Sequence, residues 1–144
     1  MNNKAFLTIL PALFVIAFSF TSCEKEKSLS ELLIGKWEVE SEQQIYSISN
    51  DKKFEYILYY DPEELAFEFT SGGSMIVYQD GDVYSMLPYA LSGNTLTIET
   101  ASGNMELKNV TVDGNSLSWS EFGTDVISET TYNVEVIYTT VKVD

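Results

Sequence analysis

Two acidic clusters carry side chains that could do chemistry, Asp80-Gly81-Asp82 and Asp61-Pro62-Glu63-Glu64. Carboxylate oxygens are good calcium ligands, and a pair of carboxylates can hydrolyse a glycosidic bond. Neither cluster has the spaced series of ligands found in an EF-hand loop. Because turns favour Asp and solvated loops favour Glu, we interpret both clusters as turns on a soluble rim. No metal site and no cofactor are therefore expected.

The composition excludes several other classes of function. The 144 residues include 22 Asp and Glu, eight Lys, and neither His nor Arg. Without His, no base of the usual kind is present to activate the many Ser and Thr hydroxyls, so the sequence predicts a protein that is not an enzyme. The formal net charge of -14 opposes binding to a nucleic-acid backbone, and nucleic acid is not expected as a partner.

An apolar segment near the N-terminus predicts export. Residues 5–20 are apolar apart from two hydroxyl residues but include Pro11, and this segment is shorter than the ~20 residues of a membrane-spanning helix. We interpret residues 1–22 as a signal peptide. The segment ends at Phe20-Thr21-Ser22-Cys23, which resembles the lipobox of bacterial lipoproteins. A plain secretory signal followed by a chance cysteine is the alternative.

The lipobox resemblance implies that Cys23 becomes the lipidated first residue of the mature protein. Cys23 is the only cysteine, so no disulfide competes with acylation. Lipoproteins of this kind carry several acyl chains such as palmitate, which anchor a protein stably to a membrane. The following residues, 24–27, are charged and resemble the surface-export signal of some Gram-negative lipoproteins. We expect the outer membrane, at the cell surface or the periplasmic face, with residues 23–29 as the lipidated cysteine and tether.

Residues 30–144 are predicted to form one all-β domain. From Gly72 onward, glycines recur every 8 to 12 residues, at 72/73, 81, 93, 103, 114 and 123, which is typical of short strands joined by turns. Six turns give seven consecutive antiparallel strands with alternating apolar and polar residues. Residues 36–45 and 54–60 add two more, so we expect about eight to ten strands. A capping box at Ser28 and Glu31 predicts one short helix before Gly35.

An up-and-down meander removes its exposed edges by pairing its first strand with its last, so we expect a closed barrel. The last segment, residues 132–143, changes its alternation near 138–140, which predicts a β-bulge there.

The approach to the first strand, Leu32-Leu33-Ile34-Gly35-Lys36-Trp37, resembles the N-terminal signature of lipocalins. Together with residues 89–98 and 110–119, it resembles the lipocalin-like domain of bacterial lipoproteins. This resemblance implies that Gly35 and Trp37 form the barrel-closing signature and that Trp37 packs across the closed end, often beneath a basic residue. Lys142 is the basic residue nearest the C-terminus.

The barrel interior has two interpretations at this stage. It could bind a small apolar ligand in a cavity, because an eight-stranded barrel is just wide enough to be filled or to hold one small ligand. The residues expected to line that cavity are Tyr56, Tyr60, Phe67, Phe69, Tyr89, Leu96 and Trp119. Alternatively, the barrel is packed and serves as an interaction module that meets a protein or a glycan through outward-facing tyrosines. The negative charge favours a neutral or cationic ligand.

The lipid anchor gives the first testable prediction. Replacing Cys23 with Ala removes the only thiol, so the variant should fail to incorporate labelled palmitate in the expressing bacterium. Metabolic labelling followed by membrane fractionation measures this. Unchanged labelling of Cys23→Ala would contradict lipidation at this residue.

Overall fold

The computed structural model describes residues 25–143, which form one short helix and nine strands. The predicted signal peptide and Cys23 lie outside the described residues. The elements follow the chain in this order: α1 (Leu29–Leu33), β1 (Gly35–Ile48), β2 (Asp51–Tyr59), β3 (Leu65–Phe69), β4 (Ser74–Gln79), β5 (Asp82–Ser92), β6 (Thr95–Thr100), β7 (Gly103–Asp113), β8 (Ser116–Ile127) and β9 (Thr130–Val143).

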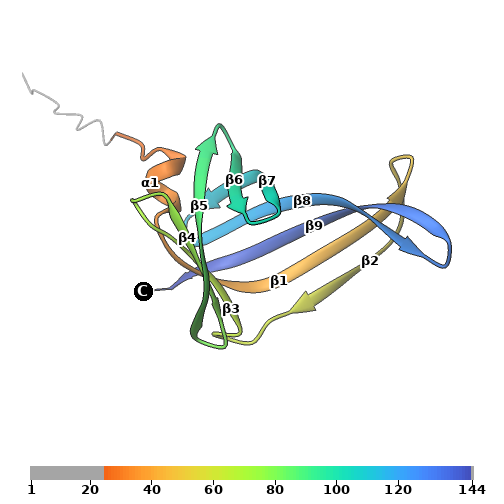
Figure 1. Cartoon of the computed structure of the whole chain (residues 1–144), viewed down its shortest axis with the longest axis horizontal. Coiled ribbons are helices and arrows are strands. Elements are labelled where there is room, and N and C mark those ends of the chain that lie inside the picture. Colours follow the sequence, from red (N-terminus) through yellow and green to blue (C-terminus); the bar gives the residue numbers. More distant parts are fainter. Residues whose placement is uncertain (1–24, 144) are drawn as a thin grey trace, which may run out of the picture.

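Eight of the strands close into an antiparallel barrel, as the sequence predicted (Figure 1). The strand order is β1-β3-β4-β5-β6-β7-β8-β9, and β9 pairs back onto β1. β2 is the extra strand, and it pairs with β1 beyond the point where β3 ends. The predicted all-β class, the closure and the strand number are thus confirmed. The helix is also present, with the predicted capping box at Ser28 and Glu31.

Alternation along the strands fills the barrel with apolar side chains. Partners in an antiparallel pair share one face of the sheet, so the inward face can be followed from Leu91 on β5 to Leu96 on β6 and Leu107 on β7. Ten side chains form the buried core. They are Leu33, Trp37, Phe69, Met75, Leu96, Ile98, Leu107, Val110, Leu117 and Trp119.

Trp37 is fully buried where α1 meets the barrel. Its indole N–H donates to the carbonyl of Leu33 at 2.8 Å, and the Lys142 ammonium lies 5.1 Å from the centre of its ring. Lys142 also donates to the carbonyl of Ile34. A β-carbon at Gly35 would lie 2.8 Å from Cε of Lys142, and φ at Gly35 is +132°, so glycine is favoured there on both grounds.

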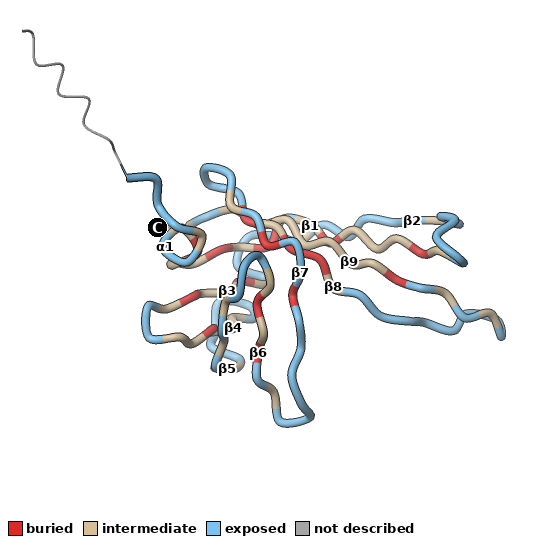
Figure 2. Tube along the Cα trace, turned by 90° about the horizontal axis from the view of Figure 1, so that it is seen from above, coloured by how far each residue is buried: buried red, intermediate tan, exposed pale blue. Residues whose placement is uncertain are grey.

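β1 and β9 are each 14 residues long, and their outer halves extend beyond the barrel. Residues 41–48 of β1, all of β2, residues 121–127 of β8 and residues 130–137 of β9 form a four-stranded extension, which we call the arm. Both views show these strands running together away from β3–β7 (Figures 1 and 2). The arm and the barrel are therefore parts of one continuous sheet.

A bulge at Glu40 changes the alternation of β1. Val39 pairs with Thr140, whereas Ser41 pairs with Thr139, so Glu40 is an extra residue on β1. The prediction of a bulge on the last strand is wrong as to the strand, because β9 pairs with β8 without interruption. The irregularity lies on the facing strand, and odd residues of β1 face inward before it while even residues do so after it.

Five of the six turns predicted from the regularly spaced glycines are present. Gly123 is the exception, because it lies within β8 at an ordinary φ. The chain instead turns at Ser128 and Glu129, which both have positive φ. Neither residue type is a usual choice for that conformation, so no turn was predicted at these two residues. Residues 121–127 consequently continue the sheet into the arm.

Truncating a core side chain tests the filled barrel. Leu96→Ala should lower the free energy of unfolding by about 2–5 kcal/mol, because Leu96 is fully buried and a cavity would remain. The matched control is Met86→Ala on β5, where the side chain is 61% exposed, and it should change stability little. Urea unfolding measures both. Similar losses in the two variants would contradict a packed interior.

Candidate functional site

The seven residues predicted to line an internal cavity do not lie around one space. Phe69, Leu96 and Trp119 are buried in the core, and Phe67 and Tyr89 pack against it. Tyr56 lies on the arm and Tyr60 lies beside it. The core rings contact one another. Phe67 and Trp119 meet edge to face, with centroids 5.3 Å apart, and Phe69 and Tyr89 do so at the same distance.

The hollows found in the described structure lie on its surface. None of four such hollows is lined by a residue of the buried core. Ligand binding inside the barrel remains a prediction, and the packing favours the filled interior. Two hollows that combine apolar and polar side chains lie on the arm. A third, lined by Met105 and Glu106 of β7 and Phe122 of β8, lies between β7 and the arm.

A polar cluster separates the apolar core from the inner face of the arm. The bulge at Glu40 turns Glu42 inward, where its side chain is buried. Tyr60 donates its hydroxyl to Glu42 at 2.7 Å, and the amide of Gln44 donates to the other carboxylate oxygen. Sequence reasoning missed Glu42, although a change of parity from Val39 to Tyr46 in the apolar pattern was a usable signal.

Burial shapes the protonation of groups around this cluster. Desolvation raises the pKa of Glu121, and the nearby charge of Glu42 adds to the effect, while the indole N–H of Trp119 acts in the opposite direction. That buried N–H makes no hydrogen bond of normal geometry in the described structure. Burial and the bond to Glu42 raise the pKa of Tyr60 to about 12, and burial also raises the pKa of Tyr138.

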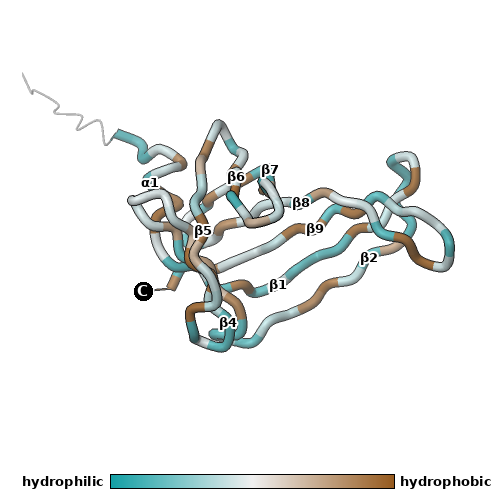
Figure 3. Tube along the Cα trace, viewed as in Figure 1, coloured by the Kyte–Doolittle hydropathy of each residue, from teal (hydrophilic) through white to brown (hydrophobic). Residues whose placement is uncertain are grey.

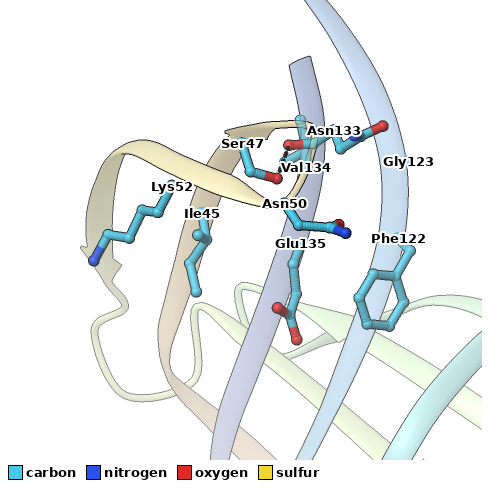
Figure 4. A pocket seen from close by; sticks show the side chains of 9 residues that line it. All are labelled: Ile45, Ser47, Asn50, Lys52, Phe122, Gly123, Asn133, Val134 and Glu135. Carbon is cyan, nitrogen blue, oxygen red and sulfur yellow. Dashed lines mark hydrogen bonds between the residues drawn. The ribbon is translucent and has the colours of Figure 1, made fainter.

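The larger arm hollow, of about 470 Å³, opens on the outer face of the sheet (Figure 4). Phe122 on β8 and Ile45 on β1 supply apolar walls, and Glu135 on β9 lies between them. Asn50 reaches toward β9 from the turn between β1 and β2, where its φ is 64°. The remaining lining residues are Ser47, Lys52, Gly123, Asn133 and Val134.

The lining of this outer hollow suits a ligand with both apolar and hydroxylated surface. Its amides can donate and accept hydrogen bonds, Glu135 accepts one from Ser120 at 3.0 Å, and Ser47 donates to the carbonyl of Asn133 at 3.5 Å. The ring of Phe122 is 57% exposed and free to contact a ligand. Sequence reasoning did not select Asn50, Phe122 or Asn133. For Phe122 and Asn133, the reason is that the turn at residues 128–129 was missed.

A second hollow, of about 270 Å³, lies on the opposite, inner face of the arm over Gly123. A β-carbon at Gly123 would meet nothing within 4 Å, so the missing side chain leaves this space open. Tyr46 forms one wall, stacked on Phe54 with ring centroids 4.7 Å apart. Glu121 and Asp125 add carboxylates, and the Tyr46 hydroxyl donates to Asp125 at 3.4 Å.

Exposed apolar side chains are concentrated on the arm. Eight of the twelve large exposed apolar residues lie there, and hydrophobic stretches are visible on β2 (Figure 3). The eight are Ile48, Tyr56, Ile57, Leu58, Tyr59, Phe122, Val126 and Ile127, whereas Val83, Tyr84, Met86 and Met105 lie elsewhere. A clustered distribution of this kind marks an interaction surface.

The acidic clusters that opened the sequence analysis come together at one corner. Asp61, Pro62, Glu63, Glu64 and Asp80 line a shallow surface hollow. Within residues 25–143, no group of three or more carboxylate, His or Cys side chains has the geometry to hold a metal ion. Over the same residues, no helix is long and apolar enough to cross a membrane.

Comparison with known proteins adds no family. Neither the models of known protein families nor the curated proteins contain a match to this sequence.

The raised pKa of Glu121 gives a pH-dependent prediction. Because the folded state holds this proton more tightly than the unfolded chain, ionisation of Glu121 lowers the stability of the fold as the pH rises above about 4.5. Glu121→Gln cannot ionise, so the variant should be more stable than the native protein at pH 7. The difference should vanish when both are compared below pH 4. Urea unfolding at the two pH values measures this, and a constant difference would contradict the assigned burial.

Proposed function

We propose that this protein is a non-catalytic binding module, anchored to the outer membrane through a lipid on Cys23, that recognises a neutral or cationic saccharide with its arm. The observation that carries the proposal is the contrast between the filled barrel and the arm, where the exposed apolar side chains and two mixed hollows gather. A ligand inside the barrel would have to displace tightly packed core side chains.

The chemistry of the outer hollow supports a saccharide in particular. A sugar ring presents apolar C–H groups on one face and hydroxyl groups around its edge. The exposed ring of Phe122 offers a flat apolar surface, and Asn50, Asn133 and Glu135 offer hydrogen-bonding groups around it. Its volume of about 470 Å³ lies within the usual range of roughly 300–1,000 Å³ for ligand sites.

The placement of the arm is consistent with an anchor at the N-terminus. The described chain begins beside α1, and the arm extends from the other end of the molecule (Figures 1 and 2). A lipid on Cys23 would hold the α1 end toward the membrane and leave the arm toward the surroundings. The net charge of -14 would repel anionic ligands at long range, which favours a neutral or cationic one.

Removal of the exposed ring tests this function. Phe122→Ala should weaken binding about tenfold, as expected for losing roughly 1.4 kcal/mol of contact, and Phe122→Tyr should bind nearly as well as the native protein. Asn50→Gly keeps the positive φ of the turn and removes only the amide, so it should also weaken binding. Tyr84→Ala removes a ring that is 73% exposed on the barrel and serves as the matched control.

The measurement is a screen of the full chain in detergent against neutral and cationic oligosaccharides, followed by calorimetric titration of the best ligand. Binding that Tyr84→Ala loses but Phe122→Ala and Asn50→Gly retain would contradict the arm as the site. Failure of every oligosaccharide, with saturable binding of an apolar probe instead, would favour a ligand inside the barrel.

A further inference from the structure

β2 forms a free edge of the sheet. It stands at the end of the strand order, and β1 is the only described strand with which it pairs. The amide of Tyr60 donates to the carbonyl of Glu40 at 3.1 Å. Because peptide groups alternate in direction along a strand, those of Glu55, Ile57 and Tyr59 point away from β1. Each of these three residues presents an N–H and a C=O at the free edge.

The side chains along this edge do not protect it. Between Phe54 and Tyr60 the only charged residue is Glu55, which pairs with Lys52 at 2.6 Å and accepts a hydrogen bond from Gln43. The four residues that follow Glu55 are all large, apolar and exposed, at 42, 45, 47 and 79% for residues 56 to 59. Native edge strands are normally guarded by charges, prolines or bulges. On β2, a bulge at Lys53 and the charges of residues 51–53 stand at the start of the strand, whereas residues 54–59 are regular. This regular segment is a template for another strand.

The second free edge of the arm differs in this respect. Residues 121–127 of β8 extend beyond the pairing with β7. They include Glu121, Gly123 and Asp125, so a strand added there would meet two carboxylates. The β2 edge instead has a single carboxylate between residues 54 and 60, already paired with Lys52, beside four consecutive exposed apolar residues.

We infer that β2 pairs antiparallel with β2 of a second copy of this chain, about a twofold axis that passes between the two Ile57 residues. Facing residues in such a pair lie on the same side of the sheet. The register sets Tyr56 opposite Leu58, Glu55 opposite Tyr59 and Phe54 opposite Tyr60. Just beyond the paired segment, it brings the bulged Lys53 of one copy toward Asp61 of the other, two residues past the end of β2.

The charges within β2 and at Asp61, two residues past its end, select this register. Centring the pair on Glu55 would set two carboxylates face to face, and centring it on Leu58 would set Glu55 opposite Asp61. Centring it on Tyr56 would leave Lys53 opposite Tyr59, with no ion pair. Like charges directly opposite destabilise a sheet and opposite charges stabilise it. Of these four registers, only the one about Ile57 brings opposite charges together and no like charges.

The overall negative charge does not prevent this pairing. Each copy has a net charge of -14, but salt screens charges over about 8 Å under physiological conditions, so local pairs dominate. A twofold interface uses the same surface on both copies and closes at two. The two arms would then join into one sheet with corresponding faces on the same side. This inference does not depend on the proposed saccharide site.

Disulfide trapping of the full chain in detergent tests the register. In Ile57→Cys the two facing α-carbons should lie about 5.5 Å apart, which is within reach of a disulfide. In the control Tyr59→Cys the same residue of each copy would be four positions out of register, roughly 13 Å away, and should not cross-link. The native chain shows any contribution of Cys23. We expect Ile57→Cys to form at least tenfold more covalent dimer than Tyr59→Cys.

A charge at the twofold axis tests the association itself. Ile57→Lys places two ammonium groups together and should weaken the dimer at least tenfold in sedimentation equilibrium, whereas Val126→Lys on β8 should leave it unchanged. Equal cross-linking of the two cysteine variants, a native chain that stays monomeric, or larger open-ended species would each overturn the inference. Saccharide binding by monomeric Ile57→Lys would show that the dimer and the binding site are separate properties.

Discussion

The pairing of β1 with β9 is the interaction on which the rest of the molecule depends. It runs from Lys36 opposite Val143 to Ser47 opposite Asn133, so the same two strands close the barrel and support the arm. Closing the barrel uses only the first part of this pairing, because β3 follows β1 for four residues only. The outer parts of β1 and β9 extend beyond the barrel, and their peptide groups need hydrogen-bonding partners. β2 supplies these partners to β1, and β8 supplies them to β9. The arm is thus a consequence of strand length.

The pairing of β1 with β9 has one half in the barrel and one half in the arm, and the side chains pack differently in the two. Inside the barrel, apolar side chains from all sides bury one another, and Trp37 and Lys142 cover the end beside α1. In the arm, the sheet has no opposite wall, so its aromatic residues pack on their neighbours and both faces keep open hollows. The cluster around Glu42 marks the transition, and its buried carboxylate is held by two donors. The arm, which is not needed to build the core, is therefore the half of the sheet that has surface available for binding.

The sequence predicted the barrel because its signals there are local. Leu96 and Ile98 alternate with polar residues directly after Gly93 and Asn94. The structure has both the turn at Gly93 and Asn94 and the two-residue alternation of burial along β6. The arm site could not be predicted in the same way. Glu42 faces inward only because Glu40 forms a bulge, and the change of parity from Val39 to Tyr46 indicates a bulge without showing which residue is the extra one. The turn at Ser128 and Glu129 uses positive φ without glycine, so β8 was expected to end near Gly123, and Phe122 and its hollow went unnoticed.

Amide hydrogen exchange along β1 and β9 measures most directly whether one continuous pairing holds both halves together. Residues in one cooperative unit open together and exchange with similar free energies. We predict slow exchange for paired amides of β1 on both sides of Glu40, in residues 36–39 and in residues 42–46, with rates in the two groups within about tenfold of each other. Fast exchange in residues 42–46 beside a protected barrel would contradict a rigid arm built on the barrel-closing strands.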